Sequence, residues 1–102
     1  MTREEKQLLL KDLCARLPYG VKYQDKIEGG IHILSLGIIH HYERFIPYLR
    51  PLSSMTEEED FIYSQLPDGH IDEYDWLNAH HFDYRGLIPM GLALEASEGM
   101  YK

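Results

Sequence analysis

One stretch of the chain, residues 74–88, constrains the fold most, because it holds the only tryptophan. A buried tryptophan removes roughly 150–250 Å² from water, so the segment around Trp76 should supply a large share of the core. Asp72 and Asp75 suit a helix start, since short carboxylates accept bonds from the first N–H groups and favour the positive end of the dipole. Gly86 is a natural stop, so the pattern predicts a helix that begins at Asp72 or Asp75 and ends before Gly86 after about three turns. Three side chains fall on its apolar arc: Trp76, Leu77 and His80.

The N-terminal residues predict an amphipathic helix over residues 3–16. Thr2 and Glu5 match the capping box, in which each side chain satisfies a free backbone N–H of the other residue. Leucines then recur on one arc and polar residues oppose them. The apolar set is Leu9, Leu10, Leu13 and Leu17, and the polar set is Glu4, Gln7, Lys11 and Asp12. Pro18 and Gly20 end the helix.

The segments that read as extended after this helix are residues 21–24, 31–36 and 44–51. A glycine turn at residues 28–30 joins the first two, because glycine accepts positive φ at little cost. Residues 38–42 either continue the second strand or begin another. Pro47 and Pro51 disfavour helix at the residues before them, so the third segment should be an edge strand or a strap across the core.

A second helix is expected to run to Gln65. Ser54 and Thr56 each precede a glutamate by three residues, so both fit a capping box. Phe61 and Ile62 should face inward on this helix. The last three segments read as a turn, a short strand and a loose tail: residues 67–69, 92–95 and 97–102, respectively.

These elements predict a single small α+β domain over residues 1–102. It would consist of an N-terminal helix, a small antiparallel sheet of two to three strands, and two further helices packed on it. A chain of 102 residues can bury a core without disulfides. Its only cysteine, Cys14, cannot form an internal disulfide, and we expect it to pack as a small hydrophobe in a reducing compartment.

The charge is strongly acidic, with 17 Asp and Glu against 10 Lys and Arg and a net charge of −7. This disfavours non-specific nucleic-acid binding, which needs cations to displace counterions from phosphate, and it disfavours an anionic membrane. The acidity suits a basic face on another protein, or competition with nucleic acid for one, although acidity that serves solubility alone is the simpler alternative. No signal peptide and no membrane-length apolar run is evident, so the cytoplasm is the expected location.

Two histidine pairs support a metal hypothesis. His80 and Asp83 are three residues apart, a spacing at which two side chains share one helix face and can bind one ion. His81 points about 100° away from its neighbour on a helix. In a strand, His40 and His41 point to opposite faces, so one of them could complete a three-ligand site. The alternative interpretation is structural, with His80 packed against its apolar neighbours.

Recognisable catalytic motifs are absent from the sequence. There is no phosphate-binding or dinucleotide-binding glycine loop, no zinc-binding cysteine pair, no nucleophile-elbow serine and no His-Glu-x-x-His, so no cofactor is expected. The sequence therefore favours a non-catalytic protein-interaction domain. The candidate binding surface combines tyrosines with arginines: Tyr48, Arg50, Tyr84 and Arg85. The alternatives are a metal-binding protein or metal-dependent hydrolase that uses the histidine pairs, and specific nucleic-acid binding through Arg44, Arg50 and Arg85.

Three runs carry a resemblance to a known group of proteins. They are Lys-Asp-Leu-Cys-Ala-Arg-Leu-Pro-Tyr-Gly-Val-Lys, Pro-Tyr-Leu-Arg-Pro-Leu-Ser-Ser-Met-Thr-Glu-Glu-Glu and Trp-Leu-Asn-Ala-His-His-Phe-Asp-Tyr-Arg-Gly-Leu-Ile. Together the runs resemble a family of small hypothetical proteins of Bacteroides-type gut bacteria and their phages or mobile elements. The resemblance implies an intracellular accessory protein in a phage or mobile-element setting. It assigns no activity and no site residue.

Overall fold

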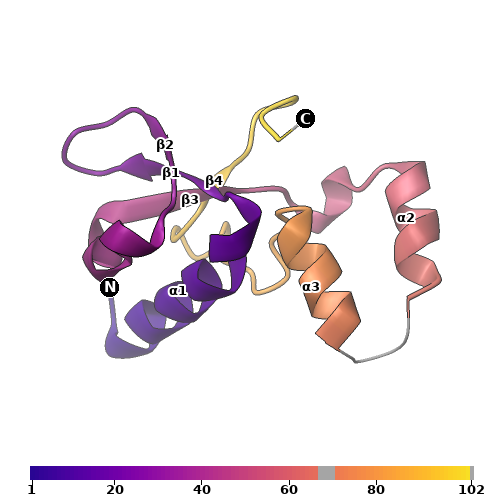
Figure 1. Ribbon diagram of the computed structural model, residues 1–102, viewed down its shortest axis with the longest axis horizontal. Coiled ribbons are helices and arrows are strands. Elements are labelled where there is room, and N and C mark those ends of the chain that lie inside the picture. Colours follow the sequence, from indigo (N-terminus) through magenta and orange to yellow (C-terminus); the bar gives the residue numbers. More distant parts are fainter. Residues whose placement is uncertain (67–70, 102) are drawn as a thin grey trace.

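The structure, a computed structural model, describes residues 1–66 and 71–101. Its helices and four-stranded sheet, of strand order β2-β1-β3-β4, confirm the predicted α+β class. The sheet and α1 occupy one end of the long axis, and α2 and α3 the other (Figure 1). The elements are α1 (Arg3–Arg16), η1 (Leu17–Tyr19), β1 (Lys22–Asp25), β2 (Ile31–Ile33), η2 (Leu36–Arg44), β3 (Phe45–Leu49), η3 (Leu52–Ser54), α2 (Glu57–Ser64), α3 (Ile71–Ala79) and β4 (Leu94–Glu95). The predicted turn at residues 67–69 lies outside the described residues.

Helix α1 has the predicted bounds and the predicted cap. The Thr2 N–H donates to Glu5 Oε1 at 2.8 Å, and the Glu5 N–H donates to Thr2 Oγ1 at 3.1 Å. Two expectations on this helix are wrong, because Asp12 is fully buried and Cys14 is exposed. Asp12 can be buried because arginine side chains meet it. Cys14 is one residue past the buried Leu13, a rotation of about 100° that turns it from the core.

The core lies between α1, η2 and one face of the sheet. Its buried residues are Leu9, Leu13, Val21, Tyr23, Leu34, Phe45, Leu49, Leu87, Leu92 and Ala93. The prediction of a strand within residues 38–42 is wrong, since this stretch belongs to the 3₁₀ segment η2. Ile38, Ile39 and Tyr42 pack against the core from η2. Their spacing of one and four residues is the spacing of a helical face, which explains why an alternating strand pattern did not apply.

The sheet is mixed. Strand β1 pairs antiparallel with β2 and β3, as predicted, and the short β4 adds a parallel pair with β3. Strand β3 therefore lies inside the sheet, and its prediction as an edge strand or strap is wrong. The Lys26 N–H bonds to the Arg44 C=O at 2.8 Å, so Lys26 and Arg44 lie opposite each other as a hydrogen-bonded pair at the end of the β1–β3 ladder. In an antiparallel ladder, hydrogen-bonded and non-hydrogen-bonded pairs alternate. The Tyr23–Pro47 pair is consequently a non-hydrogen-bonded one, so the absent proline N–H breaks no bond with β1.

Tyr101 completes the ladder between β1 and β3. Its hydroxyl accepts from the Lys22 N–H at 2.8 Å and donates to the Tyr48 C=O at 2.6 Å, at the position where the alternation would place the next direct bond. The ring also stacks on His81, with 3.6 Å between centroids. Burial raises the pKa of Tyr101 to about 12, so the hydroxyl keeps its proton. The predicted loose tail is therefore wrong for residues 97–101, because Tyr101 fixes this segment to the sheet.

Helix α3 ends well before Gly86, the predicted stop. His81 adopts a left-handed φ of 64°, and its N–H bonds to the Asn78 C=O at 3.1 Å. The Phe82 N–H bonds to the Leu77 C=O at 3.0 Å. These two bonds form a Schellman motif, with histidine where glycine is usual. Because no glycine marks this end, the sequence pattern pointed to the wrong residue.

Helix α2 lies beyond α3, at the end of the molecule away from the sheet (Figure 1). Its large apolar residues Phe61 and Ile62 are exposed. Phe61 is 68% exposed and Ile62 is 48% exposed, so the prediction that they face inward is wrong. Glu59 and Tyr63 instead face the rest of the protein, where they contact Arg50 and Trp76, respectively. The Tyr63 ring stacks on Trp76 at 5.5 Å between centroids. Polar and aromatic contacts thus join α2 to the body, and none of its residues is buried.

Candidate functional site

Arg50, a predicted binding residue, is held by intramolecular contacts. Its guanidinium binds both carboxylate oxygens of Glu59, at 2.8 Å and 2.7 Å, and lies 4.2 Å from the centre of the Phe82 ring. The hydrogen bonds from Arg50 are the main cause that lowers the pKa of Glu59 to about 2. The pair therefore stays ionised near neutral pH and fastens α2 to the end of β3.

Arg85 and Tyr84 belong to a second internal network. The Arg85 Nε–H bonds to Asp12 Oδ1 at 3.0 Å, and its Nη2–H bonds to the Tyr84 hydroxyl at 2.8 Å. The other Asp12 oxygen accepts from the Nε–H of Arg16 at 2.8 Å, and Arg16 also donates to the Phe82 C=O. The predicted surface of Tyr48, Arg50, Tyr84 and Arg85 is thus built largely from groups that bind the protein itself. The sequence missed this network because its members are far apart in the chain.

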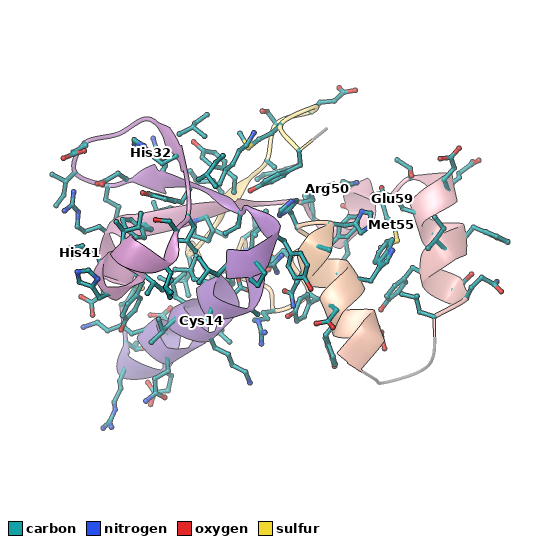
Figure 2. All side chains as sticks on the ribbon, viewed as in Figure 1. Cys14, His32, His41, Arg50, Met55 and Glu59 are labelled. Atoms are coloured by element: carbon teal, nitrogen blue, oxygen red, sulfur yellow. The ribbon has the colours of Figure 1, made fainter. Side chains whose placement is uncertain are left out.

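The predicted metal ligands do not come together. The rings of His40 and His41 on η2 contact each other in a tilted arrangement, with 4.0 Å between their centroids. Figure 2 shows His41 at the opposite end of the molecule from Glu59, whereas the His80 Nδ1 is 3.5 Å from the Glu59 carboxylate. Asp83 uses both oxygens on the N–H groups of Leu87 and Ile88, at 2.8 Å and 2.9 Å. Among residues 1–66 and 71–101, no group of three or more His, Cys, Asp or Glu could hold a metal ion.

His80 and His81 have different environments. His80 packs on Trp76 at 4.2 Å between centroids, as the structural interpretation predicted, although 41% of its side chain is exposed. His81 is buried and its Nδ1 has no hydrogen-bond partner. Burial, followed by the positive charge of Arg16, lowers the pKa of His81 to about 4, so its ring is neutral at physiological pH.

A cleft of about 640 Å³ lies between α2 and the C-terminal segment. The Arg50–Glu59 pair and His80 form part of its lining. Three further carboxylates line it from both sides: Glu58, Glu95 and Glu98. Because the positive charge of Arg50 is matched by Glu59, the remaining charge of the lining is negative. The cleft therefore suits a cationic group better than an anionic one.

The outer side of α2 combines apolar and acidic groups. We define the α2 face as Glu57, Glu58, Phe61 and Ile62, which line a hollow of about 390 Å³. Each carboxylate precedes one apolar residue by four positions, so the two kinds of side chain are neighbours along the helix. Exposed apolar groups bordered by charge are typical of surfaces that bind another protein. Sequence reasoning missed this face because it assigned Phe61 and Ile62 to the core.

The charge of the chain is divided unevenly. Residues 1–50 contain six acidic and eight basic residues, whereas residues 51–102 contain eleven acidic and two basic ones. The first half therefore carries +2 and the second half −9, which accounts for the net −7. Four of these acidic residues, at positions 57–60, are consecutive at the start of α2, so a dense run of negative charge lies at the α2 end. This asymmetry is visible in the sequence and would have pointed to that end.

Comparison with known proteins returned no relative: no protein-family model, no curated protein and no solved structure matches this chain. The resemblance to small proteins of gut bacteria and their mobile elements stays a prediction. Within the part of the chain that the structure describes, no helix is both long and apolar enough to cross a membrane.

Proposed function

We propose that this chain is a non-catalytic protein-interaction domain that docks a basic segment of another protein on the α2 face. The observation that carries the proposal is the exposure of Phe61 and Ile62 beside Glu57 and Glu58. A partner that covers these apolar groups removes them from water, and this burial contributes favourable hydrophobic free energy to binding. Lysine or arginine side chains of that partner would meet the carboxylates.

The size of the α2 face favours a modest, salt-dependent affinity. Full burial of a phenylalanine or isoleucine side chain is worth about 1.5–3 kcal/mol, and both residues are already partly covered. The negative charge of the α2 end adds attraction at long range, which increases the rate of encounter with a basic partner. Salt screens that attraction, so binding should weaken as ionic strength rises.

The biological setting is part of the same proposal. An accessory protein in the cytoplasm, associated with a phage or mobile element, is what the resemblance implies. Basic protein faces bind nucleic acid through its phosphates. The acidic α2 end would compete with nucleic acid for such a face.

The test uses the wild-type protein and the double variant Phe61→Ala/Ile62→Ala as bait in nuclease-treated host lysate. Captured proteins are quantified by mass spectrometry. A partner of the α2 face is captured by the wild type, lost by the double variant and released by salt. The matched control is Ile27→Ala, which removes an isoleucine that is 74% exposed at the other end of the molecule.

The charge component is tested with Glu57→Lys/Glu58→Lys, which should abolish capture of the same partner. Glu28→Lys is its control, since this carboxylate is 72% exposed and lies in the turn between β1 and β2. Capture that neither α2 variant changes would contradict the proposal.

A further inference from the structure

Strand β2 is an exposed edge of the sheet at the end opposite α2 (Figure 1). All three of its residues are exposed, with Ile31 at 57% and Ile33 at 63%. Natural edge strands are usually protected by very short length, charged side chains, proline or a bulge. Strand β2 is short, with three residues, but it has no charged Lys, Arg, Asp or Glu, no proline and no bulge, and the whole stretch of residues 29–42 lacks Lys, Arg, Asp and Glu.

The hydrogen-bond alternation shows which backbone groups of β2 are unpaired. The Leu34 N–H bonds to the Val21 C=O at 2.9 Å, which makes this pair a hydrogen-bonded one. Since hydrogen-bonded pairs alternate along an antiparallel ladder, the next such pair is Tyr23–His32. The N–H and C=O groups of Ile31 and Ile33 therefore point away from β1, toward the open edge.

The side chains divide between the two faces of the sheet. His32 lies on the Tyr23 side, with 5.4 Å between the ring centroids. Ile31 and Ile33 lie on the opposite face, because successive side chains of a strand alternate. Strand β2 is thus symmetric about His32, with an outward-pointing backbone unit and an exposed isoleucine on each side.

We propose that β2 binds β2 of a second copy of this chain, antiparallel, with the twofold axis at His32. Ile31 would then pair with Ile33 of the partner subunit, and each such pair would exchange both of its N–H···O=C bonds. A twofold contact brings identical surfaces together, so a charged strand would repel itself. Strand β2 carries no Lys, Arg, Asp or Glu that would cause such repulsion.

The charge distribution favours a second copy at this edge. Residues 1–50 carry only +2, whereas residues 51–102 carry −9, which includes the four consecutive carboxylates at the start of α2. Copies joined through β2 would hold their acidic ends apart, along a molecule whose longest extent is 40 Å. The dimer would leave the α2 face open, so it is independent of the proposed function.

Sedimentation measurements over a range of protein concentrations test the dimer. We expect a reversible transition to twice the monomer mass of 12.0 kDa. Ile33→Lys and Ile31→Lys should each raise the dissociation constant at least about tenfold, because each change alters both symmetric pairs. Ile27→Lys and Phe61→Lys are the controls and should leave the constant unchanged, and circular dichroism confirms that every variant is folded.

Cross-linking tests the position of the axis in a Cys14→Ser background. His32→Cys should form a disulfide between subunits on mild oxidation, because a non-hydrogen-bonded pair has Cα atoms about 4.5 Å apart. Ile31→Cys should not, because the two copies of residue 31 would be offset by about 7 Å along the strands.

Three results would overturn the proposal: a monomer at all concentrations to about 1 mM, a dimer that Ile33→Lys leaves intact, or equal cross-linking of both cysteine variants. A dimer lost through Phe61→Lys instead would assign self-association to the α2 face and also overturn it.

Discussion

Replacement of Asp12 by alanine should lower the free energy of unfolding by about 3–5 kcal/mol, the usual cost of removing one partner from a buried ion pair. Asp12 is fully buried and bridges Arg16 and Arg85. The larger share of the cost should come from Arg16, which has no exposed surface and whose Nη1 already lacks a partner. Its charge cannot reach water. Arg85 is 16% exposed and can turn toward solvent, so Arg85→Ala should cost less than Asp12→Ala.

This loss is large relative to the stability of a small domain. A chain of this length is stable by about 5–15 kcal/mol. Each 1 kcal/mol shifts the melting temperature of such a domain by about 4–8 °C, so Asp12→Ala should lower it by more than 10 °C. The free energy is obtained from urea unfolding followed by circular dichroism, with an unchanged dependence on denaturant as the sign that only stability has changed.

Two further variants make the test of Asp12 decisive. Glu43→Ala is the control, because its ion pair with Lys6 spans 3.4 Å between half-exposed side chains and should contribute little. If Asp12→Ala does not fold, Asp12→Asn keeps one acceptor oxygen and gives a smaller, measurable loss. A loss below about 1 kcal/mol, equal to that of the surface control, would refute the argument that this carboxylate holds two arginines inside the fold.

Three other predictions concern the remaining polar contacts. Glu59 has a folded-state pKa of about 2, below its ordinary 4.5, so its ionised carboxylate stabilises the fold above pH 4.5 and this contribution disappears toward pH 2. The difference in the free energy of unfolding between wild type and Glu59→Gln should therefore shrink as the pH falls from 4.5 to 2. His81 has a folded-state pKa of about 4, below its ordinary 6.5, so the free energy of unfolding should fall as the pH drops from 6.5 to 4. His81→Asn keeps a residue that tolerates the left-handed backbone, and its free energy of unfolding, measured by urea titration, should fall less over that range. Tyr101→Phe should lower the free energy of unfolding by about 1–3 kcal/mol, because the Lys22 N–H and the Tyr48 C=O lose the hydroxyl that joins them. Tyr19→Phe is the control, since Tyr19 is 37% exposed and its hydroxyl should contribute little. Equal losses for the two variants in urea unfolding would contradict the role of the Tyr101 hydroxyl.

The features that the sequence predicted correctly depend on neighbouring residues. The caps formed by Thr2 with Glu5 and by Thr56 with Glu59 are both present, because a capping box is complete within four residues. The bounds of α1 follow from the same local chemistry. The three antiparallel strands were also anticipated, although their ends differ by one or more residues from those predicted.

The features that the sequence did not predict depend on distant partners or on unusual residues. Burial of Asp12 requires Arg85, which is 73 positions away in the chain. The end of α3 requires His81 to adopt a conformation that usually marks a glycine. Phe61 and Ile62 looked like core residues because hydrophobicity alone does not say whether another element covers them.

The most direct test of the central claim is a hydrogen-exchange footprint of this protein alone and bound to a partner captured from host lysate. The proposal predicts that bound partner slows exchange in residues 57–64, that Phe61→Ala/Ile62→Ala removes both the binding and the protection, and that the protection declines with added salt. If the partner slowed exchange only outside residues 57–64, and α2 exchanged as it does in the free protein, the assignment of the α2 face as the docking surface would be contradicted.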